Sequence, residues 1–250
     1  MVNHRVLITG ATGGVGRGIA LACGAAGWEV WIAARREAEG RAVAAEVDAR
    51  GGAGRFVACD VADDASVTAA FAAVSSAGAI HGVVHNATSS YSSVPHPATE
   101  LHLDELGHQV AVGLRGCHLV ALAAHAPLRA TQGSFLVLTS EAGFEGKKLL
   151  STYATVKAAQ RGYMRVLARE WGPDGIRVNA LAPLASSPAM DDALRLDPEM
   201  RERVMRRNPL GRLGDAEHDI GPVARFLLGD DSRFVTGQTI MADGGSCPIT

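Results

Sequence analysis

The stretch RVLITGATGGVG, residues 5–16, decides which fold class this sequence can adopt. An apolar run suited to a buried strand, Arg5–Thr9, leads into a glycine-rich turn and then into an Ala-rich segment suited to a helix. Glycines let a backbone turn tightly and approach a pyrophosphate, and a helix N-terminus offers that group N–H donors. The order of strand, glycine turn and helix predicts a dinucleotide site, whereas a glycine turn alone would not. The turn residues expected to bind are Gly10, Thr12, Gly13, Gly14, Val15 and Gly16.

The same alternation of short β-rich runs and longer Ala-rich segments continues along the chain. It predicts a doubly wound α/β fold with a parallel sheet, and the strands are apolar throughout, as helices on both faces require. The expected strands are Arg5–Thr9, Glu29–Ala34, Arg55–Cys59, Gly82–His85, Ser134–Thr139, Arg177–Leu181 and Gln238–Met241. The expected helices are Gly14–Ala26, Glu37–Arg50, Asp63–Ser76, Leu101–Ala126, Tyr153–Trp171 and Ala216–Leu228.

Composition narrows the function classes. The 250 residues, 47% of them hydrophobic, suit one α/β domain spanning 1–250. A net charge of -2 gives no positive field to attract nucleic acid or an anionic membrane. The four cysteines are scattered without CxxC spacing, which argues against a disulfide framework and against a metal site. No long apolar run or signal-peptide core is present, so we expect a soluble cytoplasmic protein.

The ends of the next strands carry the residues expected to bind the adenosine half. Arg35 and Arg36 follow the second strand, where an acid would select a ribose 2′-hydroxyl and an arginine a 2′-phosphate, so NADP(H) is favoured over NAD(H). Alternatively, both arginines merely begin a solvated helix. Asp60 and Val61 are placed to bind the adenine amino group, although Asp60 alone would suit a helix N-cap.

The fourth strand ends in His85-Asn86-Ala87. Asn86 and Ala87 are small enough to pass beneath the ribose near the nicotinamide, whereas His85 taken alone is more typical of a packed or hydrogen-bonded histidine.

Tyr153 and Lys157 are the candidate chemical groups. Their spacing of four places the phenol and the ammonium on one face of a helix. The lysine charge would stabilise a phenolate and bring proton transfer within range near neutral pH. Ser140, just past an apolar strand, could orient and polarise a carbonyl oxygen. Singly, Ser140 suits a turn and Tyr153 the start of a helix; together, downstream of a nucleotide turn, they predict catalysis.

With these motifs the chain resembles the short-chain dehydrogenase/reductase family over essentially its whole length. The matching positions are Gly10, Gly14 and Gly16 of the glycine turn, Asp60, Asn86, Ala87, Ser140, Tyr153, Lys157, Asn179, Pro183, Phe234–Gln238 and Asp243–Gly245. The resemblance implies a seven-stranded Rossmann-type sheet, hydride transfer at the nicotinamide C4 of NAD(P)(H), and a small carbonyl or alcohol substrate. It also implies a homodimer or homotetramer that packs through the helices near Leu101–Ala126 and Tyr153–Trp171.

Several positions depart from the family pattern. His85 and Thr88 replace an asparagine and a glycine after the fourth strand, and Gly113 stands where many members carry an asparagine that holds a helix kink and a water in a proton relay. His85 or another water is a hypothetical substitute in that relay. Leu184 and Pro188 replace a glycine and a threonine, so nicotinamide contacts would rely on Pro183, backbone groups and Ser186 or Ser187.

The substrate pocket is expected between a loop and a lid segment. The loop Thr88–Pro97 would form one wall, and Leu184–Arg207, rich in charge and methionine, would act as a lid or, alternatively, as a solvated pair of surface helices. In that lid Met190, Leu194 and Met200 would offer apolar contact, and Arg195, Arg201 and Arg203 would meet an anionic group.

The leading hypothesis is reversible hydride transfer between NADP(H) and a ketone or secondary alcohol, with Tyr153 as the general acid/base. One alternative is a nucleotide-binding, catalytically weak subunit of a mixed oligomer, motivated by the departures at Gly113, Leu184 and Pro188. A second keeps the fold but changes the chemistry to dehydration, epimerisation or use of NAD(H).

Overall fold

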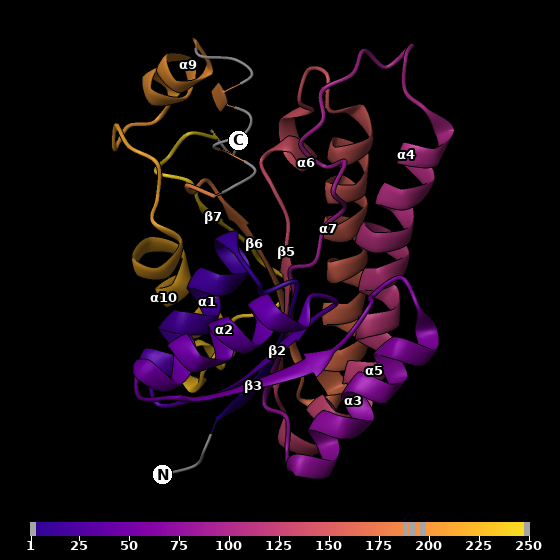
Figure 1. Cartoon of the computed structure of the whole chain (residues 1–250), viewed down its shortest axis with the longest axis vertical. Coiled ribbons are helices and arrows are strands. Elements are labelled where there is room, and N and C mark those ends of the chain that lie inside the picture. The colour runs from indigo at the N-terminus through magenta and orange to yellow at the C-terminus, as the bar shows by residue number, and fades with distance from the viewer. Residues whose placement is uncertain (1–3, 188–189, 191–193, 196–198, 248–250) are drawn as a thin grey trace.

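The computed structural model describes residues 4–187, 190, 194–195 and 199–247. Within this part of the chain seven strands form one sheet in the order β3-β2-β1-β4-β5-β6-β7 (Figure 1). Every neighbouring pair is parallel, which confirms the predicted Rossmann-type, doubly wound sheet. The strands are β1 (Arg5–Thr9), β2 (Glu29–Ala34), β3 (Ala53–Ala58), β4 (Gly82–His85), β5 (Ser134–Leu138), β6 (Arg177–Pro183) and β7 (Thr239–Ala242).

Strand ends differ from the prediction where pairing extends a strand beyond its apolar run. β3 begins at Ala53, two residues before the predicted start at Arg55, because Ala53 is in register with Glu29 at the start of β2. β6 continues to Pro183, which pairs with Ala242. Proline is tolerated at this position because the pairing with β7 uses the N–H of the next residue, Leu184, which donates to the Ala242 carbonyl at 3.0 Å.

Helices cover both faces of the sheet (Figure 1). One face is covered by α1 (Gly14–Ala25), α2 (Glu37–Ala49) and α10 (Gly221–Leu228). The other is covered by α3 (Asp64–Ala77), α5 (Gly116–Thr131) and α7 (Ser151–Trp171). The prediction missed the short α6 (Ala142–Glu145), and it placed α9 (Glu199–Arg207) in the lid without defining a helix.

The single regular helix predicted at Leu101–Ala126 is wrong in its ends and in its regularity. The chain there forms α4 (Leu103–Gln109), a π-helical segment η1 (Val110–Arg115) and then α5, which continues through Pro127 to Thr131. Leu103–Thr131 is long and apolar enough to cross a membrane by length and composition alone. Its inner face, however, carries Cys117, Val120 and Leu128 into the core with no exposure, as a core helix would.

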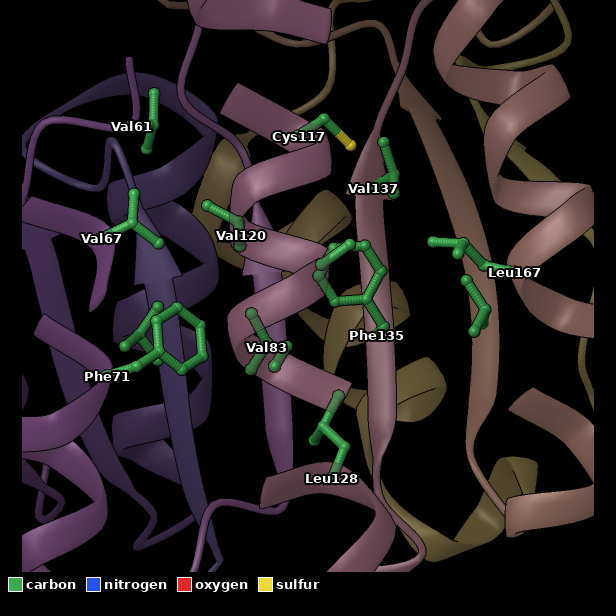
Figure 2. Packing of buried hydrophobic residues seen from close by; sticks show 14 of the residues in the cluster. Val61, Val67, Phe71, Val83, Cys117, Val120, Leu128, Phe135, Val137 and Leu167 are labelled. Atoms are coloured by element: carbon green, nitrogen blue, oxygen red, sulfur yellow. The ribbon is translucent and has the colours of Figure 1, made fainter. Parts of the chain in front are cut away.

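The core under α3, α5 and α7 is built around Phe135 of β5 (Figure 2). Phe135 is fully buried, and its ring lies edge-on to that of Trp171, with the centroids 5.7 Å apart. Leu128 from α5 and Leu167 from α7 pack on the same side of the sheet. This packing fixes α5 and α7 against β4 and β5, and therefore fixes the side chains that these helices present at the strand ends.

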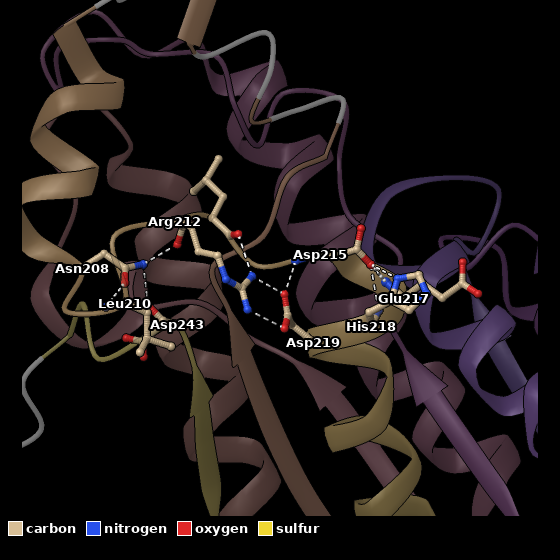
Figure 3. Close-up of polar contacts among 9 residues, drawn as sticks. Asn208, Leu210, Arg212, Asp215, Glu217, His218, Asp219 and Asp243 are labelled. Carbon is tan, nitrogen blue, oxygen red and sulfur yellow. Dashed lines mark hydrogen bonds and ion pairs between the residues drawn. The ribbon is translucent and has the colours of Figure 1, made fainter.

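The loop after α9 is fixed by a polar network (Figure 3). The Arg212 guanidinium donates to both carboxylate oxygens of Asp219, at 2.5 and 2.8 Å, and this hydrogen bonding lowers the pKa of Asp219. Asp215 caps the π-helical segment η3 (Ala216–Ile220) by accepting from the Glu217 and His218 N–H groups. Asn208 donates to the Arg212 and Asp243 carbonyls. The segment that follows α9 is thus hydrogen-bonded to η3 and to Asp243, which follows β7.

Candidate active site

A cavity of about 440 Å³ lies at the carboxyl ends of the strands, where parallel α/β sheets bind ligands. It spans the junction between β1 and β4, at which the strand order reverses. Its wall consists of residues that follow successive strands, together with the start of α7 and part of η1. The lining residues include Gly10, Thr12, Gly13, Gly14, Val15, Arg35, Arg36, Asp60, Val61, Asn86, Ala87, Val112, Tyr153, Lys157 and Pro183.

The glycine turn forms a cradle that side chains would fill. Gly10 has φ +67°, and a Cβ there would lie 2.7 Å from the Ala87 Cα. Gly14 also has a left-handed φ of +53°, and Gly13 caps α1 with its side open to the cavity. The free N–H groups at the start of α1 therefore face a space wide enough for a pyrophosphate.

Asn86 holds this cradle against β4. Its side-chain amide donates to the Thr9 and Gly10 carbonyls at 3.1 and 3.0 Å. A Cβ on Gly16 would lie 2.4 Å from the Asn86 Nδ2, so glycine is required there by the approach of Asn86, and Gly16 itself does not line the cavity. The sequence analysis missed Thr9, whose buried Oγ1 accepts from the N–H groups of both Asn86 and Ala87.

Two arginines and one carboxylate border the other end of the cavity. Arg36 donates to the Thr12 Oγ1 at 2.6 Å and pairs with Glu39 at 3.2 Å, while Arg35 lies 3.9 Å from an Asp60 oxygen. Arg35 is 63% exposed, which leaves its guanidinium accessible to a ligand. Asp60 is not the cap of α3, because Asp63 accepts the Ser66 N–H in that role.

Tyr153 and Lys157 lie at the opposite end, one turn apart on α7. Lys157 is buried, and burial lowers its pKa to about 8, so the ammonium stays mostly charged at neutral pH. Burial also raises the pKa of Tyr153, whereas its hydrogen bond with Ser140 lowers it. The Lys157 Nζ lies 5.7 Å from the Tyr153 ring centroid, and the expected lowering of the Tyr153 pKa by the lysine charge is not seen in this geometry.

His85 is fully buried, and neither of its ring nitrogens has a hydrogen-bond partner of good geometry among the described residues. Burial, reinforced by the charge of Lys157, lowers its pKa to about 3, although the Gly113 carbonyl opposes this shift. The imidazole is therefore neutral at physiological pH, which does not favour His85 as a proton donor in a relay.

The loop Thr88–Pro97 and the start of the lid contribute a polar rim to the cavity. Thr88, Ser92 and Ser93 from the Thr88–Pro97 loop line the cavity, and so does Ser187, whereas the exposed Ser186 does not. A hydrogen bond between the Ser89 hydroxyl and the His108 ring, and one that Gln109 donates to the Tyr91 carbonyl, hold this loop on α4.

None of the described lid residues beyond Ser187 lines the cavity. Pro188 and the side chain of Met200 lie outside the described residues. The Arg207 Nη2 of α9 donates to both carboxylate oxygens of Glu145, at 2.6 and 2.8 Å. This ion pair connects α9 to α6, which begins two residues after Ser140.

The cavity fits a dinucleotide. Its volume suits a cofactor-sized ligand, the glycine cradle accepts phosphate, and hydrogen-bonding groups stand at both ends. Among the described residues no group of three His, Cys, Asp or Glu side chains could hold a metal ion, and the four cysteines are free and buried. Fold and site together define a dinucleotide-binding α/β protein of the oxidoreductase class.

Comparison with known proteins specifies this class. The family model described as enoyl-(acyl carrier protein) reductase matches residues 10–247. L-rhamnose 1-dehydrogenase (NAD(P)(+)) of Azotobacter vinelandii is 32% identical, over 98% of this chain and 97% of that protein. This chain belongs to the short-chain dehydrogenase/reductase family and is an NAD(P)(H)-dependent enzyme acting on CH–OH or C=O groups.

Solved structures agree with this assignment. A short-chain type dehydrogenase/reductase from Mycobacterium ulcerans superposes with a TM-score of 0.91 at 30% identity, covering 98% of this chain and 90% of the other. A gluconate 5-dehydrogenase from Burkholderia cenocepacia, solved with NADP and tartrate, has a TM-score of 0.91 at 29% identity, covering 98% and 96%.

We expect Gly10→Ala to destabilise the protein more than Gly27→Ala. Both glycines have a left-handed φ, +67° and +75°, but only at Gly10 would a Cβ meet another backbone. Strain alone costs about 1 to 2 kcal/mol at either site, and the clash with Ala87 should add about 1 kcal/mol or more at Gly10. Urea unfolding of the two variants measures the difference, and equal losses would contradict a cradle closed by Ala87.

We also expect His85 to make the protein acid-sensitive. Its pKa is about 3 in the folded state against 6.5 in the unfolded chain, so the unfolded state binds the extra proton. Stability is therefore complete above pH 6.5 and falls as the pH drops towards 3. At pH 5 the loss is about 2 kcal/mol. The free energy of unfolding, measured across pH, should fall less steeply towards acid in His85→Asn than in the wild type. An equally steep fall in both proteins would refute the role of His85.

Proposed function

We propose that this enzyme transfers hydride between NADP(H) and a ketone or secondary alcohol, with Tyr153 as general acid/base. The observation that carries the proposal is one cavity with two chemically distinct ends: Arg35 and Arg36 beside the glycine cradle, and Tyr153 and Lys157 at the far end. Ser140 hydrogen-bonds Tyr153 from the end of β5. Bound nicotinamide would supply the hydride at its C4.

The raised pKa of Tyr153 suits the reductive direction. A phenol has an ordinary pKa of about 10 and burial raises that of Tyr153 further, so Tyr153 is protonated near neutral pH and enters the reaction able to donate its proton. The proton would pass from the Tyr153 Oη to the carbonyl oxygen as hydride reaches the carbonyl carbon, leaving a phenolate and an alcohol. Ser140 would hold the same oxygen, and its hydrogen bond would stabilise the phenolate.

Lys157 would contact both the cofactor ribose and Tyr153. Its ammonium, charged below a pKa of about 8, would hold the ribose hydroxyls and stabilise the phenolate as it forms. In the opposite direction, the phenolate would accept the alcohol proton. Solvent would then restore the starting protonation state of Tyr153.

The preference for NADP(H) rests on the adenosine end. A 2′-phosphate there would meet the exposed Arg35 guanidinium and the Arg36 guanidinium held by Thr12. Among the described cavity residues at the end of β2, no carboxylate is placed to bind a 2′-hydroxyl; Asp60 comes from β3 and faces Arg35.

We further propose a homodimer or homotetramer in the cytoplasm. Exposed apolar side chains on α5 and α7, Leu122 at 60% and Val166 at 50% exposure, support association through these helices. Substrates remain small carbonyl or alcohol compounds, and the Thr88–Pro97 loop together with the lid Leu184–Arg207 would shape their pocket.

Arg35→Ala should remove the preference for NADPH. We expect NADPH to bind about ten- to a hundredfold more weakly, because a charge-assisted hydrogen bond to phosphate is lost, while NADH affinity stays constant. Fluorescence titration with both nucleotides measures this. Arg41→Ala, which removes an exposed arginine paired with Glu37 outside the cavity, is the matched control. A wild type that prefers NADH would overturn the cofactor assignment.

Tyr153→Phe should slow turnover strongly but leave the fold intact. We expect kcat for carbonyl reduction to fall about 10²- to 10⁴-fold, the contribution of a positioned proton donor, with NADPH affinity nearly unchanged. Tyr163→Phe removes a hydroxyl from the same helix, where it hydrogen-bonds His118, and serves as the control. Steady-state assays over a panel of carbonyl compounds measure kcat for both variants. Full activity of Tyr153→Phe would exclude Tyr153 as the proton donor.

A further inference from the structure

Gln160 is a fully buried polar residue that lies on α7 one turn after Lys157. Its Oε1 accepts a hydrogen bond from the Lys157 Nζ at 3.1 Å, and its Nε2 donates one to the Gly113 carbonyl at 2.8 Å. Glutamine is rarely buried completely, and here both ends of the amide are used. The side chain therefore links the ammonium of Lys157 to η1.

The Gly113 position explains why this link runs through a backbone carbonyl. A Cβ on Gly113 would lie 2.5 Å from the Val156 Cγ1. Valine has little rotational freedom in a helix, so the contact is not easily relieved. A side chain at position 113 would therefore require Val156 to move, and the polar connection between η1 and the lysine comes from α7 instead.

The surroundings of Lys157 make this connection matter. Besides Gln160, the Nζ donates to the Leu138 carbonyl at 2.6 Å. The titratable groups that interact with it or lie near it are His85 from β4, Cys117 from α5 and Tyr153 from its own helix.

None of these neighbours supplies a negative charge near neutral pH. The pKa of His85 is about 3, that of Cys117 about 12, and that of Tyr153 is raised. Among the described residues, two neutral carbonyl oxygens therefore hold a buried ammonium that is paired with no carboxylate. Removing either acceptor should be costly, because a buried charge is left under-satisfied.

We propose that Gln160 is a positioning residue for Lys157, fixing the ammonium between η1 and the end of β5 so that it faces the nicotinamide ribose and Tyr153. The inference rests on the proposed function, in which Lys157 holds the ribose and stabilises the phenolate. Gln160 touches neither the cofactor nor the substrate in this arrangement, and it acts through Lys157 alone.

Two substitutions at Gln160 should move the titration of Lys157 in opposite directions. Gln160→Met has a similar length but removes the acceptor, so the charged lysine loses stabilisation and its pKa falls below about 8. Gln160→Glu places an anionic acceptor at the same point, so the pKa of Lys157 rises. A purely structural role would weaken the fold in both variants without opposite shifts.

NADPH affinity, measured by fluorescence across pH values on either side of 8, reports this titration without turnover. In the wild type we expect affinity to fall as Lys157 loses its proton. The midpoint should move to lower pH in Gln160→Met and to higher pH in Gln160→Glu. At neutral pH, Gln160→Met should bind NADPH about tenfold more weakly and should reduce a carbonyl substrate with a kcat about ten- to a hundredfold lower.

Ser134→Ala is the matched control, because Ser134 is also fully buried and its Oγ hydrogen-bonds the Leu227 carbonyl at 2.8 Å, at the opposite end of β5. This variant should lose thermal stability yet keep the wild-type pH midpoint. Unshifted midpoints in both Gln160 variants, or shifts in the same direction, would refute the positioning role.

The two proposals fail in different ways. If the wild type binds NADPH with a pH-dependent affinity but reduces no carbonyl compound, the proposed function is refuted. The Gln160 variants can still be compared by their NADPH binding in that case. A wild type that reduces carbonyls, with Gln160→Met equally active and unshifted, would sink only the positioning role. Failure to bind either NADPH or NADH would overturn both.

Discussion

The hydrogen bonds from Asn86 to the turn after β1 are the constraint on which the rest of the site depends. β1 and β4 lie side by side at the point where the strand order reverses, and Asn86 donates to the Thr9 and Gly10 carbonyls across that junction. The close approach of β4 then requires glycine at Gly10 and Gly16, because a Cβ would collide with Ala87 or with Asn86 itself. The cradle is therefore a product of packing between two strand ends as much as of a glycine-rich sequence.

Burial sets the chemistry at the other end of the cavity. Lys157 lies against the end of β5, with Thr139 donating to its backbone carbonyl at 3.0 Å and Leu138 accepting from its Nζ. This enclosure lowers the pKa of Lys157 and raises that of Tyr153. Near neutral pH the site thus presents a protonated phenol close to a charged ammonium, an arrangement suited to donating a proton. The sequence predicted a lower pKa for Tyr153 from the lysine charge alone, whereas desolvation of the phenol raises this pKa.

The rim of the cavity is formed by different elements from its base. Ser92, Ser93 and Ser187 bring hydroxyl groups to its mouth, while the lid helix α9 is connected to α6 by the Arg207–Glu145 ion pair. Because α6 begins two residues after Ser140, this ion pair ties α9 to the segment that follows β5. Base and rim are therefore built on different elements: strand ends and α7 form the base of the cavity, and loops form its rim.

Local periodicity and fixed spacing were enough to predict the parallel α/β fold and the strands β1, β2 and β4 to the residue. They also singled out Gly10, Arg35, Tyr153 and Lys157, which the structure brings to one cavity. Tertiary structure decided what depends on distant partners. Side chains that meet across elements produce the π-helical segment around Gly113, the burial of His85, the acceptors of Lys157 and the position of Ser187 rather than Ser186 at the rim. Gln160 is the clearest case: its position in α7 looks like any helical residue, and only the packing of α7 on η1 buries its amide between a lysine and a backbone carbonyl.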